Sequence, residues 1–244
     1  MSHAAQITLL SPSVNDGSFE SNVVTDNTFG VRQGPFTMAS GVWNISNTQN
    51  GGLHGGILTN IPNGANSAVL AGANGTNALF SDGTTDPGQQ NSATATSINL
   101  LGGQYLSVHA GDVFSWSFMV NSRGLDSTGT LRFNFGNGDI QTVGTGIDGD
   151  GNISTFAIIS GTYTATAADA AGGQFSAIFS LATGKTSTGV SGSGATSVYG
   201  DDVNVSVVSV PEASTTLFGF AAVALSMTRR RRANIGLVAQ DVLS

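Results

Sequence analysis

Apolar and polar residues alternate with a period of two in several segments of the chain. In Asp112–Val120 four large apolar side chains fall on one face: Phe114, Trp116, Phe118 and Val120. Thr130–Phe135 and Val203–Val207 alternate in the same way. This alternation is typical of strands that bury one face. We therefore expect strands here, with those near 112–120 and 130–136 adjacent and central.

Weaker alternation predicts further strands, and glycine- and asparagine-rich pieces separate them. The further segments are Phe36–Ile45, Ala78–Ser81, Ala93–Leu100, Ile153–Tyr163 and Gln174–Leu181. No helical stripe of three turns precedes residue 213. Many short strands with frequent turns indicate an all-β fold, an antiparallel β-sandwich of the jelly-roll kind over residues 7–208. One short C-terminal transmembrane helix is expected to follow it.

The net charge of the chain limits the kinds of molecule that it can bind. Residues 1–210 hold four basic and thirteen acidic residues, a net charge of −9. A body this acidic repels phosphate backbones, so we expect no nucleic-acid partner. The chain has no cysteine, which excludes disulfides, thiolate metal sites and cysteine nucleophiles.

The C-terminal region has the order of a membrane signal. Residues 213–228 carry no charge, and as a helix these 16 residues would span about 24 Å, slightly less than the hydrocarbon core. Four consecutive arginines, Arg229, Arg230, Arg231 and Arg232, then stop transfer and stay on the cytoplasmic side. The acidic body is thereby placed outside. A buried core helix and a plain tail anchor are the alternatives.

The motif before this span adds a resemblance. Val210, Pro211, Glu212, Ala213 and Ser214, followed by the apolar span and the arginines, resemble the PEP-CTERM sorting signal over residues 209–232. Ala213 stands where that family usually has a second proline, and residues 233–244 extend past the usual end. The resemblance implies recognition by the membrane protease exosortase, removal of the tail, and a location at the cell surface or in the extracellular matrix after transient anchoring in the inner membrane.

Met1–Leu10 lacks the basic and apolar regions of an export signal, and we interpret residues 1–6 as the remnant of an export-signal region. His3-Ala4-Ala5-Gln6 looks like the remnant of a cleavage region. We expect the true start upstream, or a signal already removed.

The two ends of the predicted sandwich carry a second resemblance. Asn15–Glu20 with Gly41-Val42-Trp43, and Tyr199–Val205, resemble the opening and closing strands of galactose-binding-like jelly rolls and related carbohydrate-binding modules. The resemblance implies that the first and last strands pair. It also implies a structural calcium near Glu20 and Asp201 or Asp202. Asp148–Ser154 is a second calcium candidate, although the Glu expected at position twelve of such a loop is missing.

The sequence offers little for catalysis. The histidines are His3, His54 and His109, and no Ser/His/Asp order with a recognisable elbow appears. Trp43 and Trp116 are expected in the core. We therefore expect a non-catalytic exported surface or matrix protein, with extracellular polysaccharide as a further partner. A carbohydrate-binding module with an exposed aromatic row, or a jelly-roll hydrolase with a buried carboxylate pair in a cleft, are the alternatives.

Overall fold

A computed structural model of the chain describes residues 5–21, 31–48, 55–59, 73, 75–82, 91–122, 127–146, 156–183 and 197–210. Nearly all the regular structure in these ranges is strand. The first sheet contains β1 (Gln6–Leu10), β2 (Val31–Gln33), β5 (Gly55–Thr59), β6 (Asn77–Asp82), β8 (Val113–Ser122), β11 (Ala157–Thr164) and β13 (Ser197–Val208). The second contains β3 (Phe36–Thr37), β4 (Trp43–Thr48), β7 (Ser92–Ser97), β9 (Thr128–Asn134), β10 (Ile140–Gly146) and β12 (Ser176–Ala182).

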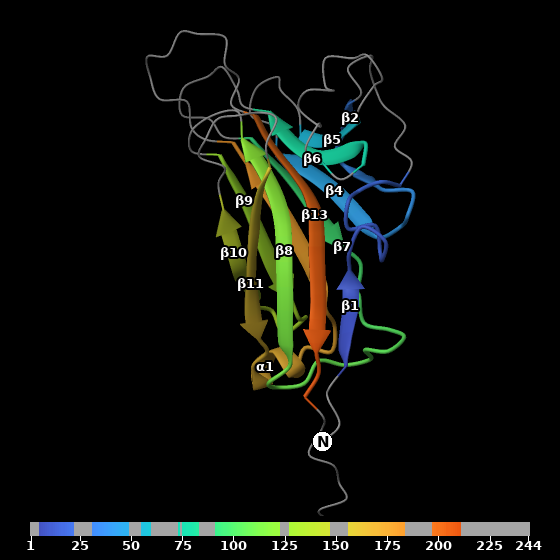
Figure 1. The fold of residues 1–244 in the computed structure, drawn as a ribbon, viewed down its shortest axis with the longest axis vertical. Coiled ribbons are helices and arrows are strands. Elements are labelled where there is room, and N and C mark those ends of the chain that lie inside the picture. The colour runs from blue at the N-terminus through green and yellow to red at the C-terminus, as the bar shows by residue number, and fades with distance from the viewer. Residues whose placement is uncertain are drawn as a thin grey trace, which may run out of the picture. The chain divides into compact units, whose positions relative to one another are not determined.

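Every pairing between these strands is antiparallel, and the two sheets face each other as a sandwich (Figure 1). The order in the first sheet is β11-β8-β13-β6-β5-β2, with β1 added beside β13. The order in the second is β10-β9-β12-β7-β4-β3. The expected all-β antiparallel sandwich is confirmed, as is the pairing of the first strand with the last.

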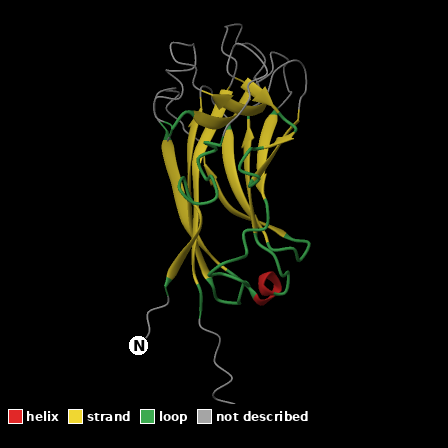
Figure 2. Ribbon diagram, turned by 90° about the vertical axis from the view of Figure 1, so that its right-hand side faces the viewer, coloured by secondary structure: helices red, strands yellow, loops and turns green. Residues whose placement is uncertain are grey.

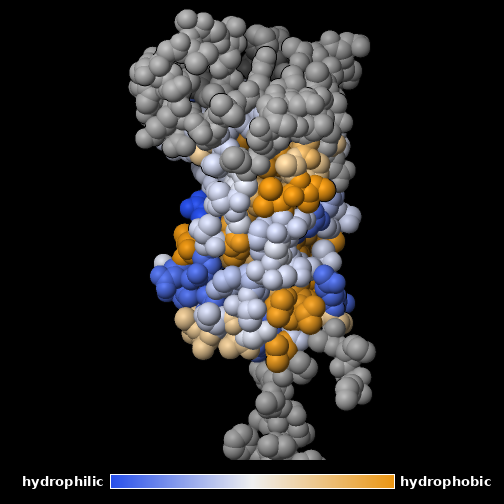
Figure 3. All heavy atoms as spheres, turned by 60° about the vertical axis from the view of Figure 1, so that its left-hand side comes forward, coloured by the Kyte–Doolittle hydropathy of each residue, from blue (hydrophilic) through white to orange (hydrophobic). Residues whose placement is uncertain are grey.

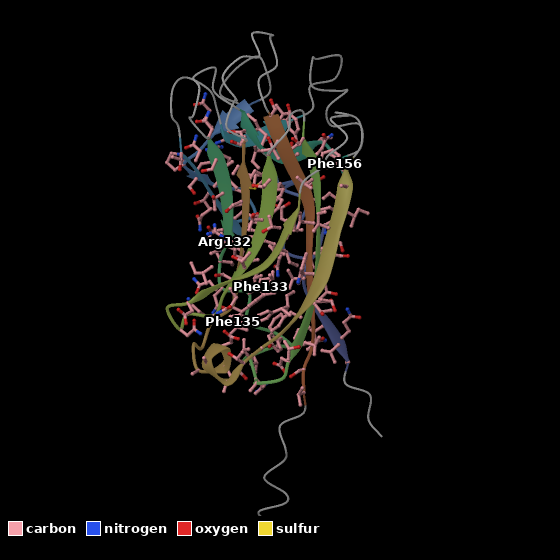
Figure 4. All side chains as sticks on the ribbon, turned by 90° about the vertical axis from the view of Figure 1, so that its left-hand side faces the viewer. Arg132, Phe133, Phe135 and Phe156 are labelled. Atoms are coloured by element: carbon pink, nitrogen blue, oxygen red, sulfur yellow. The ribbon has the colours of Figure 1, made fainter. Side chains whose placement is uncertain are left out.

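The sheets are held together by the apolar faces that the alternation marked. Phe114 of β8, Phe133 of β9 and Phe175 lie within 5.6 Å of one another between ring centroids. Phe133 and Phe135, both labelled in Figure 4, are fully buried. Trp43 and Trp116 are also buried, as expected, at 0% and 7% exposure. Burial of this aromatic surface is the main favourable term for the sandwich.

The expectation that strands 112–120 and 130–136 are neighbours in one sheet is wrong. β8 lies in the first sheet between β11 and β13, and β9 lies in the second between β10 and β12. Their aromatic faces meet across the core instead, since both strands bury one face. Alternation defines which face is buried, but it does not define which strand is the hydrogen-bonded partner.

The last strand, β13, changes partner halfway along its length. One side pairs with β8 almost throughout, while the other pairs first with β6 over Ser197–Gly200 and then with β1 over Val205–Val208. The register shifts between Asp201 and Asn204, where neither β6 nor β1 continues. This bulge is where the loop after β1 meets the sheet.

Helix is almost absent from the described part of the chain. The single helix there, α1 (Ala167–Ala170), is one turn long and is closed by a capping box between Thr166 and Asp169 (Figure 2). No helix in the described ranges is long and apolar enough to cross a membrane. The chain divides into two compact units, Met1–Val210 and Pro211–Ser244, and the expected span at 213–228 lies in the second, outside the described residues.

Candidate functional site

The loop that follows β1 is built around the motif Asn15–Glu20. Asn15, Asp16 and Phe19 adopt left-handed backbone angles, with φ of 57°, 54° and 58°. Gly17 accepts the N–H of Val203 at 2.9 Å, which satisfies a backbone donor in the bulge of β13. A Cβ on Gly17 would come within 2.4 Å of the Val203 carbonyl oxygen, so only glycine fits there. The loop fills the gap between β1 and β6.

Glu20 fastens this loop to the start of β6. Its carboxylate accepts the backbone N–H groups of Thr76 and Asn77 at 3.0 and 2.8 Å, and also the Thr76 hydroxyl at 3.0 Å. The preceding residue, Phe19, packs on Trp43 with ring centroids 5.1 Å apart, and the Trp43 indole donates to the Asp16 carbonyl. Glu20 is therefore a structural anchor in its own right.

Asp201 and Asp202 occupy the bulge of β13. Asp201 is completely buried, and one of its oxygens accepts the N–H of Asp202 at 2.7 Å. Asp202 has φ of 55°, and its carbonyl accepts the side-chain amide of Asn204. Both aspartates directly precede Val203, whose N–H donates to the opening loop.

The side-chain oxygens of this region bear on the expected calcium site. In the described ranges no three Asp, Glu or His side chains gather closely enough to hold a metal ion. However, Asp16 Oδ2, Ser21 Oγ and Asn77 Oδ1 are buried there without a hydrogen-bond partner. Unpaired buried oxygens are costly, and hard oxygens are what calcium prefers. The calcium at Glu20 and at Asp201 or Asp202 therefore stays a prediction. The second candidate, Asp148–Ser154, lies outside the described residues.

A second polar cluster surrounds Asp112, just before β8. The Asp112 carboxylate is fully buried and accepts the Tyr105 hydroxyl, the N–H groups of His109 and Val210, and the Ser209 hydroxyl, at 2.7 to 3.0 Å. We call these contacts the Asp112 clasp. It holds Ser209 and Val210, the last described residues, and Val210 is the first residue of the expected sorting motif. Pro211, Glu212, Ala213, Ser214 and Arg229 to Arg232 lie outside the described residues.

The electrostatics of the clasp follow from these donors. Burial alone would raise the pKa of Asp112, but the hydrogen bonds from Tyr105, His109, Val210 and Ser209 outweigh it and lower that pKa. Burial and the bond to the Asp112 carboxylate raise the pKa of Tyr105. Asp169 resembles Asp112. Burial alone would raise its pKa, but hydrogen bonds from Thr166, Tyr163 and Asn137 outweigh that effect, so its pKa is lowered. Both carboxylates are therefore ionised anchors.

The clasp also brings together side chains that the sequence did not connect. His109 Nε2 lies 3.1 Å from Ser107 Oγ, and His109 Nδ1 lies 3.4 Å from Asp112 Oδ2. Ser209 Oγ lies equally close to Nδ1, at 3.4 Å. The arrangement has the order of a Ser/His/Asp relay, but the carboxylate is already occupied by donors from Tyr105, Ser209 and two backbone N–H groups.

The outer face of the second sheet is polar and almost uncharged. The register of β4, β7, β12 and β9 aligns three cross-strand rows: Asn44-Thr96-Ile178-Arg132, Ser46-Thr94-Ser180-Thr130 and Thr48-Ser92-Ala182-Thr128. We call this surface the hydroxyl face. Arg132, labelled in Figure 4, is its one charged residue and donates to Ser180 Oγ at 2.7 Å. The sequence predicted a strand over Ala93–Leu100, which overlaps β7, but this alternation does not reveal the extent of the face.

The described surface has no row of exposed aromatic side chains on which a sugar could stack. Trp43, Trp116, Tyr105 and Tyr199 are all less than 8% exposed. Figure 3, seen from the side of β10 and β11, shows separate apolar patches among polar residues. Two exposed isoleucines on these strands are Ile140 and Ile158.

No model of a known protein family matches the sequence, and no curated protein matches it. Solved structures do resemble its fold. A Stig cyclase from Fischerella sp. TAU, in complex with an indole compound, is 13% identical with a TM-score of 0.50, over 83% of this chain and 98% of that one. A further Fischerella sp. TAU cyclase structure is 14% identical with a TM-score of 0.50, over 84% and 100%.

The CBM22-1 xylan-binding domain from Paenibacillus barcinonensis is 17% identical, with a TM-score of 0.38 over 86% of this chain and 99% of that one. At these identities the similarity to the two cyclase structures concerns the fold alone. Function therefore has to be argued from the side chains.

We predict that replacing Asp112 with Asn lowers the free energy of unfolding by about 2–3 kcal/mol at pH 7, because charged hydrogen bonds to buried donors are lost. The lowered pKa means that this stabilisation is present above the ordinary carboxyl pKa of about 3.9 and disappears as the pH falls through the folded-state value. Urea unfolding at pH 7 and pH 3 measures it. A difference between the two proteins that is as large at pH 3 as at pH 7 would contradict the role of the ionised carboxylate.

We also predict that calcium raises the melting temperature and that a chelator lowers it, since an ion bound only by the folded state stabilises that state. Asp16→Asn keeps a residue that tolerates the left-handed backbone, but it should remove the calcium response. Asp139→Asn, at an exposed turn, is the matched control and should keep it. Identical melting of the wild-type protein with calcium and with chelator would argue against the metal.

Proposed function

We propose that this protein is an exported, non-catalytic surface or matrix component whose sandwich, a galactose-binding-like jelly roll, associates with neutral polysaccharide. The observation that carries the proposal is the hydroxyl face. Serine, threonine and asparagine side chains both donate and accept hydrogen bonds, as sugar hydroxyls do. The described part of this face has no carboxylate, so it can meet a neutral glycan without desolvating an anion.

The affinity of one such contact surface is expected to be low. Each exchanged hydrogen bond contributes only about 0.5–1.5 kcal/mol, and no aromatic ring on the face adds stacking. Weak binding suits a matrix, because many copies on one surface gain avidity along a repeating polymer. The acidic body would at the same time disfavour anionic polymers.

The absence of catalysis is part of the proposal. A glycoside hydrolase needs a carboxylic acid that keeps its proton near neutral pH, which requires a raised pKa. The pKa values of the buried Asp112 and Asp169 are both lowered, and each carboxylate is bonded to its own chain. These two groups are therefore suited to anchoring.

Sorting completes the proposal. In it, exosortase reads Pro211 and Glu212, residues 213–228 span the membrane, and the arginine cluster fixes the orientation. The Asp112 clasp supports this arrangement because it holds the domain in place up to Val210, the residue directly before Pro211. The protein would then leave the inner membrane for the surface or the extracellular matrix.

We predict that the protein is retarded by neutral polysaccharides such as xylan or galactan in affinity electrophoresis. Thr94→Glu and Ser46→Glu place carboxylates in the middle row of the hydroxyl face and should remove most of the retardation. Ser160→Glu, on the exposed side of β11 in the other sheet, adds the same charge as a control. The proposal fails if the wild-type protein migrates alike with and without every neutral polymer.

We predict that the mature protein in its native host lacks the residues after about Glu212. Replacing Pro211 and Glu212 with alanine should leave it uncut and bound to the membrane, because arginines cost at least about 2.5 kcal/mol each to move through hydrocarbon. Mass spectrometry of the C-terminus measures this. An intact peptide from Asn234 to Ser244 on most molecules, in a host with an exosortase, would show that the tail is only an anchor.

A further inference from the structure

A groove lies beside β1, and none of its lining residues belongs to the three rows of the hydroxyl face. Its walls are β1 itself and the segment 98–104 that follows β7, and its volume is about 390 Å³. This lies within the range of small-molecule sites, about 300–1,000 Å³. None of its lining residues carries a charge, although the body as a whole is strongly acidic.

One wall of the groove holds an amide whose orientation is fixed. Asn99 Oδ1 accepts two backbone N–H groups, that of Leu101 at 3.2 Å and that of Phe175 at 3.0 Å. Two donors on one atom require that atom to be the oxygen, so the Nδ2 group is defined as well. Asn99 is exposed, and its Nδ2 protons are left for solvent or a ligand.

A second fixed amide complements the first. Asn15 Nδ2 donates to the Leu9 carbonyl at 2.7 Å, which leaves Asn15 Oδ1 as an acceptor. Its left-handed backbone, with φ of 57°, is held by the loop that packs on β13. The groove therefore presents an oriented donor and an oriented acceptor without the entropic cost of ordering them on binding.

Apart from the polar residues Thr8 and Gln104, the rest of the lining is apolar or glycine. Ile98 exposes 47% of its surface beside Leu101, which gives the groove apolar contact area. At Gly102 and Gly103 no atom lies within 4 Å of the place where a Cβ would stand. A ligand can thus approach the backbone closely at this end.

We propose that this groove is a separate binding site for a short stretch of neutral oligosaccharide. A pair of neighbouring sugar hydroxyls accepts from Asn99 Nδ2 and donates to Asn15 Oδ1, while the apolar face of the ring packs against Ile98 and Leu101. The absence of a cation in the lining excludes strong binding of uronic acids or sulfated sugars. The inference rests on the proposed association with polysaccharide, but it assigns a site that the hydroxyl face does not include.

The test uses the full domain and three neutral trisaccharides, cellotriose, xylotriose and mannotriose, with trigalacturonic acid as the anionic comparison. Asn99→Asp keeps an oxygen for the Leu101 and Phe175 N–H groups, so the fold is retained, but it replaces the donor by an anion. We expect at least one neutral trisaccharide to shift the Asn99 side-chain amide signals in NMR titrations. Asn99→Asp should weaken that binding about tenfold.

A second variant, which adds no charge, distinguishes loss of the groove contacts from an indirect effect of the new carboxylate. Gly103 has φ of 55°, which asparagine tolerates, so Gly103→Asn adds a side chain in the groove without backbone strain. It should also weaken trisaccharide binding, whereas Ser160→Asp on β11 should leave it unchanged. Trisaccharide binding that both groove variants retain would overturn the inference.

Failure of the site and failure of the function give different results. If polysaccharides retard the protein through the hydroxyl face but no trisaccharide perturbs Asn99, the groove is not a binding site and the proposed function stands. If neither polysaccharides nor trisaccharides bind, both are wrong. Binding of trigalacturonic acid as tight as that of the neutral sugars would also overturn the assignment to neutral ligands.

Discussion

The change of partner along β13 is the constraint on which the rest of the first sheet depends. A strand in the middle of a sheet has to satisfy hydrogen-bonding groups on both sides. β8 supplies one side, but β6 and β1 each cover only part of the other. The gap between them is filled by the loop at Asn15–Glu20, whose Gly17 carbonyl accepts the Val203 N–H. Without this loop the bulge would leave a buried donor unsatisfied.

Several features of the molecule follow from that junction. Phe19 enters the core beside Trp43, and Glu20 binds the start of β6, so the loop is fixed on three sides. The same fixing holds Asn15 against Leu9 and so creates one wall of the groove beside β1. The loop also carries a buried oxygen of Asp16 that has no hydrogen-bond partner, close in the chain to the predicted calcium ligand Glu20. The loop Asn15–Glu20 thus completes the first sheet and also contributes to the candidate metal site and to the candidate ligand groove.

At the other end of β13 the Asp112 clasp has a comparable role. The strand pairs with β8 as far as Val208, and the clasp binds the next two residues, Ser209 and Val210. A buried carboxylate is costly unless its charge is met by donors, and here four donors lower its pKa. The clasp therefore fixes Val210, the residue directly before the Pro211 and Glu212 that we propose exosortase reads.

The sequence by itself determined the fold class and which side chains form the core. Alternation at Phe114, Trp116 and Phe118 predicted their burial, because a period of two places successive side chains on opposite faces. It could not say that β8 and β9 belong to different sheets, because both arrangements bury the same faces. Nor did spacing show that Asp112 meets Ser209 and Val210, or that Asn15 and Asn99 line one groove. Contacts between residues this far apart in the chain are decided by strand order and register, which only the packing of the two sheets fixes.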